Sequence, residues 1–233
     1  MQIAGITKLT LLDYPGKLAC TVFTPGCQLR CPFCHNAQLA LANPNEPTDF
    51  STDEAISYLK KRNNVIEGVC ISGGEPLMQD GIVDFIKDVK SLGYLVKLDT
   101  NGGFPEKLAM LLDLRLIDYV AMDIKNCLSR YAETCGHESI GLSQFRKSIS
   151  LIQNSSIAYE FRSTIVRELH NKENILQFNA WGIGTSKLFL QSFQNSSNVM
   201  RSGLHGYSAI EMEALRQSIL PIIPNTSVRI TGN

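Results

Sequence analysis

The sequence predicts an α/β protein, a partial (β/α)6 barrel of parallel strands with outer helices, in a single domain over residues 1–233. Two observations predict this class. Short apolar segments rich in β-branched and aromatic residues alternate with segments of helical periodicity, and no linker or repeat interrupts them. Six such strand–helix units in succession join parallel strands through right-handed crossovers, so a site is expected at the carboxyl ends of the strands.

The predicted elements follow one another along the whole chain. The strands are expected at residues 19–24, 68–72, 94–99, 119–123, 159–165 and 187–191, with a weaker one at 227–231. The helices are expected at residues 52–62, 81–92, 105–112, 142–153, 172–180 and 208–220. Ser51 or Thr52 serves as the N-cap of the first helix. The segment 39–50, rich in asparagine and proline, is expected to be a loop.

The composition excludes several classes of protein. The 22 Lys and Arg residues balance 22 Asp and Glu residues, so there is no electrostatic footprint for nucleic acid or for an acidic membrane surface. No apolar run approaches the ~18–20 residues of a membrane helix. The N-terminus lacks the basic stretch and the apolar core of a signal peptide. We therefore expect a cytoplasmic protein.

The cysteines are the unusual feature of the composition. Their number, seven, is odd, which argues against a disulfide framework. Cys27, Cys31 and Cys34 have the spacing C-x3-C-x2-C, and thiolates are the ligands of iron–sulfur clusters. Three ligands on a four-iron cluster would leave one iron without a protein ligand. Such an iron can bind a substrate, which indicates a cluster that takes part in a reaction rather than one that only stores an electron. A zinc site with His35 as fourth ligand, or a group of structural thiols, are the alternatives that the spacing leaves open.

Polar motifs follow three of the predicted strands. The segment 72–76, Ser-Gly-Gly-Glu-Pro, comes after the second strand and could be a ligand-binding loop or simply a tight turn. Asp99 ends the third strand, and Asp123 and Lys125 end the fourth. These carboxylates could line a site or cap the helices that follow. Parallel topology brings all of them to one edge of the sheet.

The fifth predicted strand carries charges on one face. Glu160 and Arg162 stand at alternate positions, so either they pair with each other or their face points into a polar cavity. A strand at the surface, with both charges in solvent, is the plainer alternative. The other residues with potential chemistry have plainer interpretations. Cys20, Cys70 and Trp181 are expected to pack in the core, Cys127 and Cys135 to be thiols in a loop, and His137, His170 and His205 to be solvated.

The C-x3-C-x2-C motif, with the aromatic Phe33 just before its last cysteine, resembles the signature of the S-adenosylmethionine (SAM) radical superfamily. The resemblance implies a [4Fe–4S] cluster held by Cys27, Cys31 and Cys34. It also implies that SAM chelates the open iron through its amino and carboxylate groups, with Phe33 beside the adenine. The Gly73-Gly74-Glu75-Pro76 segment is similar to the superfamily motif whose backbone carbonyls bind the SAM amino group, with Glu75 in support.

The strand-end carboxylates resemble those of the glycyl-radical-enzyme activases. This resemblance implies that Asp99, Asp123 and Lys125 line the SAM site and that a monovalent cation can sit near the two aspartates. It also implies that Arg162 lies near SAM. Some activases have a histidine near the position of Gln194, so the chain departs from them there.

The segment 6–17 and the residues Cys34-His35-Asn36 resemble short activating proteins of anaerobic ribonucleoside-triphosphate reductases. The implied enzyme is a radical SAM oxidoreductase. Flavodoxin or ferredoxin would reduce its cluster, SAM would be cleaved reductively, and the resulting radical would remove hydrogen from a glycine of the reductase. The alternatives are an activase of a pyruvate formate-lyase-like enzyme and, in another class, a SAM-independent metal-binding or electron-transfer module.

Overall fold

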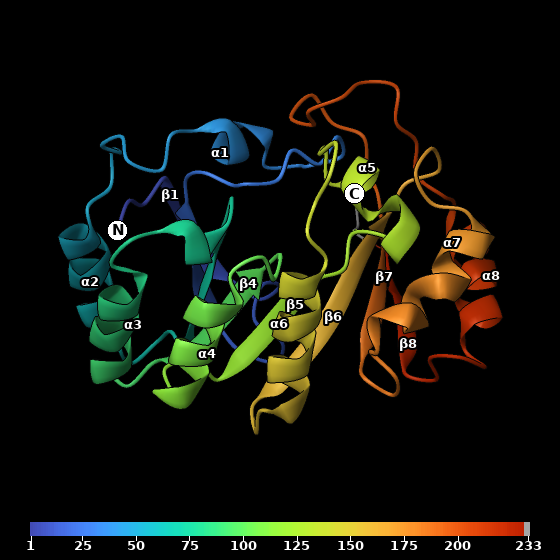
Figure 1. Ribbon diagram of the computed structural model, residues 1–233. Helices are drawn as coiled ribbons and strands as arrows, with labels where there is room; N and C mark the ends of the chain where they lie inside the picture. The colour runs from blue at the N-terminus through green and yellow to red at the C-terminus, as the bar shows by residue number, and fades with distance from the viewer. Residues whose placement is uncertain (231–233) are drawn as a thin grey trace.

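One curved sheet of eight strands runs through the computed structural model, which describes residues 1–230 (Figure 1). The strands lie in the sheet in the order in which they occur in the chain. They are β1 (Gly5–Thr10), β2 (Ala19–Thr24), β3 (Gly68–Gly73), β4 (Leu95–Thr100), β5 (Tyr119–Asp123), β6 (Ala158–Ile165), β7 (Leu188–Ser192) and β8 (Thr226–Arg229). The pair β1–β2 is antiparallel, whereas every neighbouring pair from β2 to β8 is parallel.

Helical segments make each crossover between the parallel strands. The α-helices are α1 (Ala37–Leu41), α2 (Thr52–Lys60), α3 (Ile82–Ser91), α4 (Pro105–Asp113), α5 (Tyr131–Thr134), α6 (Ser143–Asn154), α7 (Lys172–Leu176) and α8 (Ala209–Ile219). The 3-10 turns are η1 (Pro76–Met78), η2 (Leu128–Arg130) and η3 (Gln177–Trp181). All six predicted strand–helix units are therefore confirmed within the described residues. Ser51 caps α2 through a capping box with Glu54.

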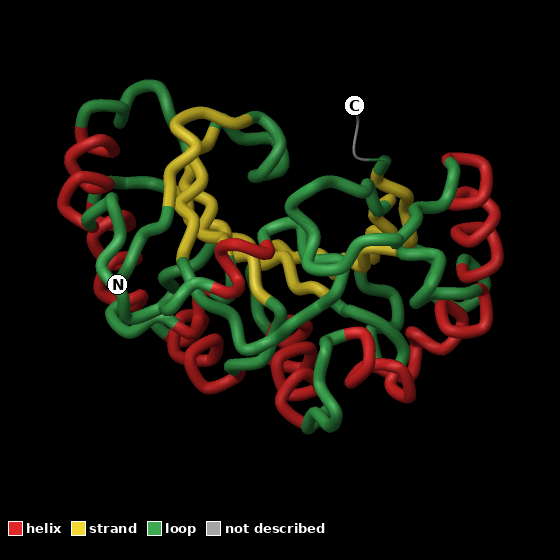
Figure 2. The backbone as a smooth tube through the Cα atoms, turned by 90° about the horizontal axis from the view of Figure 1, so that it is seen from above, coloured by secondary structure: helices red, strands yellow, loops and turns green. Residues whose placement is uncertain are grey.

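The sheet curves into an open half-barrel. Figure 2 shows the strands as an arc with most of the helices on its outer side. The two edge strands β1 and β8 do not pair with each other, so the predicted partial barrel is confirmed as open rather than closed. Within residues 1–230, no helix is long and apolar enough to cross a membrane.

The two faces of the sheet differ in chemistry because side chains alternate along each strand. On β4, Val96 and Leu98 join the apolar core under the helices, whereas Lys97 and Asp99 line polar cavities inside the arc. On β6, Phe161 joins the same core, and the residues on either side of it face the interior. The core is thus one layer between sheet and helices, and the concave side is left for polar chemistry.

The structure corrects the sequence predictions at three places. Strand β1 was not predicted, because its mostly half-buried and exposed residues at a sheet edge lack the apolar alternation of a buried strand. Helix α1 was missed too, and it extends to Leu41 into the segment predicted as loop. The predicted helix 172–180 divides into α7 and η3. The weak strand is confirmed as β8, and Thr231 at its predicted end lies outside the described residues.

An aromatic cluster fixes the segment between β5 and β6. The ring centroid of Tyr131 lies 5.0 Å from that of Phe145 on α6 and 4.7 Å from that of Trp181. Trp181 also donates a hydrogen bond from Nε1 to the carbonyl oxygen of Asn126, at 2.8 Å. The prediction that Trp181 packs in the core is therefore confirmed, and the cluster ties α5 to α6 and η3.

Replacing Phe145, which is fully buried, by alanine should lower the free energy of unfolding by about 3–5 kcal/mol, because burial is lost and a cavity remains. Urea denaturation measures this loss. Ile210→Ala is the control, since Ile210 is 84% exposed and its truncation should cost less than about 0.5 kcal/mol. Equal losses in the two variants would contradict the packing role of Phe145.

Candidate functional site

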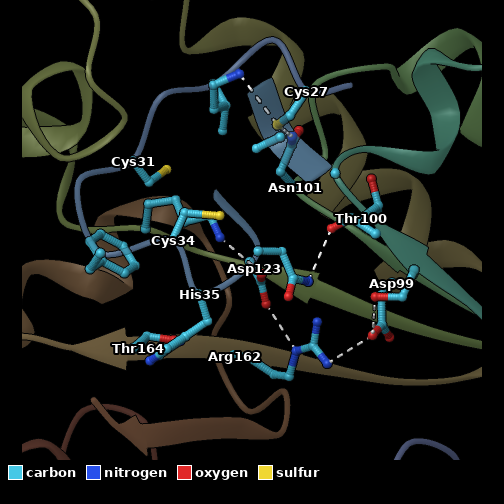
Figure 3. A pocket seen from close by; sticks show the side chains of 18 residues that line it. Cys27, Cys31, Cys34, His35, Asp99, Thr100, Asn101, Asp123, Arg162 and Thr164 are labelled. Carbon is cyan, nitrogen blue, oxygen red and sulfur yellow. Dashed lines mark hydrogen bonds and ion pairs between the residues drawn. The ribbon is translucent and has the colours of Figure 1, made fainter. Parts of the chain in front are cut away.

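One cavity at the carboxyl ends of the strands collects the residues that the sequence singled out (Figure 3). All the predicted site residues except Glu75 line it. They are Cys27, Cys31, Phe33, Cys34, Gly73, Gly74, Asp99, Asp123, Lys125 and Arg162. Thr100, Asn101 and Thr164 also contribute to its wall. The topology explains the gathering, because parallel strands end at the same edge of the sheet.

The three thiols of the C-x3-C-x2-C motif lie on one side of this cavity, in the loop that follows β2 (Figure 3). A turn closed by the hydrogen bond from the Cys34 amide to the Cys31 carbonyl, at 3.0 Å, separates the last two cysteines. Cys27 Sγ accepts hydrogen bonds from the Leu29 amide at 3.4 Å and from Asn101 Nδ2 at 3.6 Å. Asn101, which sequence reasoning did not single out, thus links the cysteine loop to the end of β4.

Burial affects the protonation of two of these thiols, Cys27 and Cys34. It raises the pKa of Cys27 to about 12, with Glu75 acting in the same direction. It also raises the pKa of Cys34, although Lys125 opposes the change. Protonated thiols must lose their protons to bind a metal, and the cation of Lys125 favours that loss.

His35 is turned away from the role of a zinc ligand. Its Nε2 donates a hydrogen bond to the carbonyl oxygen of Gln194 at 2.7 Å, and its ring lies 5.2 Å from that of Phe193. Among residues 1–230, no three His, Cys, Asp or Glu side chains are arranged to hold a single metal ion. This geometry disfavours the zinc alternative.

A chain of alternating charges crosses the opposite side of the cavity (Figure 3). Asp123 and Arg162 are direct neighbours in the register of β5 and β6, and Arg162 Nε donates to Asp123 Oδ1 at 2.9 Å. The other side of the guanidinium lies 3.4 Å from Asp99 Oδ2. Lys125 Nζ donates to Asp123 Oδ2 at 2.9 Å, and Lys97 pairs with Asp99. The carboxylates therefore form ion pairs and do not cap the following helices.

The cations keep both carboxylates ionised. Burial acts to raise the pKa of Asp123, but Arg162 and Lys125 outweigh it and lower that pKa to about 2. Arg162 and Lys97 likewise outweigh burial at Asp99 and lower its pKa. Both carboxylates already have cationic partners from the chain. The monovalent cation expected near these aspartates remains a prediction.

The glycines of the segment 72–76 are required by chain packing. A Cβ atom on Gly74 would lie 2.0 Å from the carbonyl oxygen of Gly26, and one on Gly73 would lie 2.3 Å from the backbone of Thr24. The Glu75 amide donates to that same Gly26 carbonyl at 2.8 Å. These contacts press the end of β3 against the chain that leads into the cysteine loop.

Glu75 lies behind the cavity wall and organises it. Its carboxylate accepts hydrogen bonds from Leu77 N at 3.1 Å, from Thr100 Oγ1 at 2.8 Å and from Asn101 N at 2.7 Å. Burial nevertheless dominates and raises the pKa of Glu75 to about 7. Glu75 thus connects the turn after β3 to the end of β4, which carries Asn101 toward the cysteine loop.

The face with Glu160 and Arg162 points into a polar interior. Glu160 pairs with Arg229 on β8 at 3.1 Å and accepts a hydrogen bond from the Tyr119 hydroxyl at 2.9 Å. It lines a second cavity inside the arc, to which Asp99 and Arg162 also belong. Glu160 and Arg162 each pair with another residue and Glu160 is buried, so the polar cavity is confirmed rather than a mutual pair or a surface strand.

The chain matches the model of the Radical SAM superfamily over residues 21–175. The chain belongs to the radical SAM superfamily. It is 33% identical over 177 residues to protein MJ1227 of Methanocaldococcus jannaschii, whose name places it provisionally among glycyl-radical enzyme activating enzymes; the match covers 74% of this chain and 72% of that one. It is also 33% identical over 135 residues to the pyruvate formate-lyase-activating enzyme of Listeria monocytogenes, which covers 53% of each chain.

Among solved structures, the radical SAM chain resembles Streptococcus suis SuiB with a TM-score of 0.69 over 91% of its own length. The match covers 48% of SuiB at 15% identity, so this likeness concerns the fold alone. The chain thus spans about half the length of SuiB and of the Listeria enzyme.

The cofactors of this radical SAM enzyme are a [4Fe–4S] cluster and SAM, and the cavity has side chains of the matching chemistry. Within residues 1–230, the sulfur atoms that line it come from Cys27, Cys31 and Cys34. Thiolates are the ligands that iron–sulfur clusters require. The ion pair of Asp123 and Arg162 offers both signs of charge across the cavity from those thiols, which suits the amino and carboxylate groups of SAM.

His170 differs from its sequence prediction, and Cys135 makes a contact that the sequence did not indicate. His170 is buried and not solvated, and it donates from Nε2 to the Lys125 carbonyl at 2.7 Å while Nδ1 accepts from the Val166 amide. Cys135 is also buried, and its carbonyl oxygen accepts a hydrogen bond from the Arg30 amide at 2.9 Å. Both contacts join residues far apart in the chain, so sequence spacing gave no signal for them.

His170 should make stability depend on pH. Burial lowers its pKa from 6.5 to about 4, so between these values the unfolded chain binds a proton that the folded chain does not. Stability from this residue is therefore lost as pH falls from 6.5 to 4, by roughly 3 kcal/mol in total. Urea unfolding of wild type and His170→Gln across this range measures the effect. Parallel pH curves for the two proteins would contradict it.

Proposed function

We propose that this enzyme is an activase that uses its [4Fe–4S] cluster and SAM to make a glycyl radical on a partner protein. The observation that carries the proposal is the cavity itself, in which three thiols face a set of paired charges at the ends of parallel strands. Sequence similarity to two proteins named as activating enzymes of this kind supports it.

In this proposal Cys27, Cys31 and Cys34 hold the cluster. Cluster and SAM together supply, after one-electron reduction, a 5′-deoxyadenosyl radical that can remove a hydrogen atom from a glycine. Phe33 is assigned to the adenine of SAM. Lys125 Nζ stands 6.0 Å from the centre of the Phe33 ring, which places a cation beside that subsite.

The remaining residues orient SAM. The carbonyls of Gly73 and Gly74 are assigned to its amino group, and buried Glu75 fixes that segment against the end of β4. Asp123 and Arg162 present paired charges to the amino acid part of SAM. Such preorganised groups lower the entropic cost of bringing the reactants together.

The open side of the half-barrel suits a macromolecular substrate, because a polypeptide segment can enter beside the sheet edge. We assign the anaerobic ribonucleoside-triphosphate reductase as the partner, on the resemblance of the segment 6–17 and of Cys34-His35-Asn36. Flavodoxin or ferredoxin is the proposed electron donor. Similarity to the Listeria enzyme favours a pyruvate formate-lyase-like partner as the second candidate.

Anaerobic electron paramagnetic resonance (EPR) tests the proposal. The reconstituted, reduced enzyme is mixed with SAM and with the anaerobic reductase from the same organism, or with its pyruvate formate-lyase-like enzyme in a parallel sample. A glycyl-radical doublet with the first partner supports our assignment. A doublet with the second partner alone would show that the pyruvate formate-lyase-like enzyme is the substrate of this activase. A reduced-cluster signal with no doublet in either sample would overturn the activase proposal.

Cys31→Ala should abolish both the [4Fe–4S] absorbance and SAM cleavage, because two thiolates do not retain a site-differentiated cluster. Ultraviolet–visible spectra and chromatography of 5′-deoxyadenosine provide the two readouts. Cys20→Ala is the matched control, since Cys20 is a buried thiol on β2 away from the cavity lining. SAM cleavage by the Cys31→Ala enzyme would show that the cluster assignment is wrong.

Asp123→Ala should weaken SAM binding at least tenfold, or ~1.4 kcal/mol, while the cluster absorbance stays intact. The physical reason is that Lys125 and Arg162 lose their shared carboxylate and no longer hold their positions. Anaerobic equilibrium binding of SAM measures the change. Asp84→Ala, at an exposed position on α3, is the control and should bind SAM with wild-type affinity. Unchanged SAM affinity in Asp123→Ala would show that Asp123 does not belong to the SAM site.

A further inference from the structure

We infer that His170 is a positioning residue of the SAM site, whose imidazole holds the ring of Phe33 in place to receive the adenine of SAM. The inference rests on the proposed function, since that function assigns Phe33 to the adenine. His170 lies outside the C-x3-C-x2-C motif and behind the cavity wall, with 1% of its surface exposed.

The ring of Phe33 is held by contacts with His170 and Lys125. Phe33 lines the cavity and is itself buried. The centroid of its ring lies 6.2 Å from that of the His170 imidazole, and the two planes meet at 75°, which is an edge-to-face contact. Lys125 Nζ stands 6.0 Å from the same Phe33 centroid. A shift of the imidazole would therefore allow the Phe33 ring to move.

Two buried hydrogen bonds fix the orientation of the imidazole. Nδ1 accepts from the Val166 amide at 3.1 Å, so the ring proton is on Nε2. Nε2 donates this proton to the Lys125 carbonyl oxygen at 2.7 Å. Any rotation of the ring would leave one of these backbone groups without its partner, and an unpaired buried polar group is costly. The imidazole is therefore a fixed support for Phe33.

The turn that carries His170 is fixed as well. The amides of Leu169 and His170 both donate to the Val166 carbonyl, at 3.1 and 2.8 Å. The Leu169 carbonyl accepts from Asn126 Nδ2 at 2.9 Å, and the His170 carbonyl accepts from the Tyr207 hydroxyl at 2.7 Å. His170 thus joins the chain after β5, the chain after β6 and the segment before α8, so it cannot follow a moving Phe33.

The consequence concerns the adenosyl part of SAM. An aromatic ring that is already ordered can bind a flat base without a further loss of side-chain freedom. The amino acid part of SAM is assigned instead to the open iron and to the charged groups. Among these groups, Lys125 is held by Asp123, whose Oδ2 lies 2.9 Å from its Nζ, and this pair does not involve His170. Loss of His170 should therefore weaken binding of SAM and leave binding of methionine unchanged.

The test compares the affinities of the cluster-loaded full chain for SAM and for L-methionine. Anaerobic equilibrium dialysis of the oxidised enzyme measures SAM binding, and the EPR signal of the reduced cluster follows a titration with methionine. His170→Ala removes the ring and both hydrogen bonds, whereas His170→Gln removes the ring and keeps a side-chain donor. We expect SAM affinity to fall roughly threefold to tenfold in both variants, with methionine affinity at the wild-type value.

Phe145→Leu is the control for a general loss of stability, because Phe145 is fully buried on α6 and does not line the cavity. This variant should bind both ligands as the wild-type enzyme does. An equal loss of SAM affinity in Phe145→Leu overturns the inference, and so does a loss of methionine affinity in the His170 variants as large as their loss of SAM affinity.

Wild-type SAM affinity in His170→Ala or His170→Gln also overturns the inference. If His170→Ala does not hold a cluster, His170→Gln decides by the same two affinities. If neither variant holds a cluster, His170 is required for folding rather than for placing Phe33, and the inference fails. A wild-type chain that binds no SAM would instead overturn the proposed function.

Discussion

Arg162 stands between two carboxylates, Asp123 beside it on the neighbouring strand and Asp99 one strand further, and the polar interior of the half-barrel depends on this arrangement. Each of these ions has left bulk water, and only an opposite charge at hydrogen-bond distance offsets that cost. Lys97 and Lys125 complete the pairing at the two ends. The network keeps both aspartates charged and fixed in position without closing the cavity. An open half-barrel can therefore present ordered charges to a bound ligand.

Close backbone approach sets the other wall of the site. Gly74 packs against the Gly26 carbonyl, which brings the turn after β3 to the start of the cysteine loop. Glu75 then accepts a hydrogen bond from the backbone amide of Asn101, and the side-chain amide of Asn101 donates to the sulfur of Cys27. The turn after β3, the end of β4 and the cysteine loop thus form one connected structure.

The segment between β5 and β6 supports the cysteine loop from outside the cavity. Its aromatic contacts with α6 and η3 make it rigid, and its backbone reaches the loop at Gln28 and Arg30. Cys135 is placed by this support, whereas His170 holds the Lys125 carbonyl at the other side of the same segment. The buried imidazole of His170 thus holds its neighbours in place through hydrogen bonds shielded from water.

The sequence alone determined the order of strands and helices, because apolar periodicity records which residues face a core. It also determined which residues meet at the carboxyl ends, since parallel topology leaves little choice, and the spacing of Cys27, Cys31 and Cys34 pointed to their cofactor. Only the tertiary structure decided the partners of those residues. The pairing of Asp123 with Arg162 depends on register, and the hydrogen bond from the Arg30 amide to the Cys135 carbonyl joins positions about a hundred residues apart. Such contacts leave no periodic signal in a single sequence, because they arise from packing between elements rather than within them.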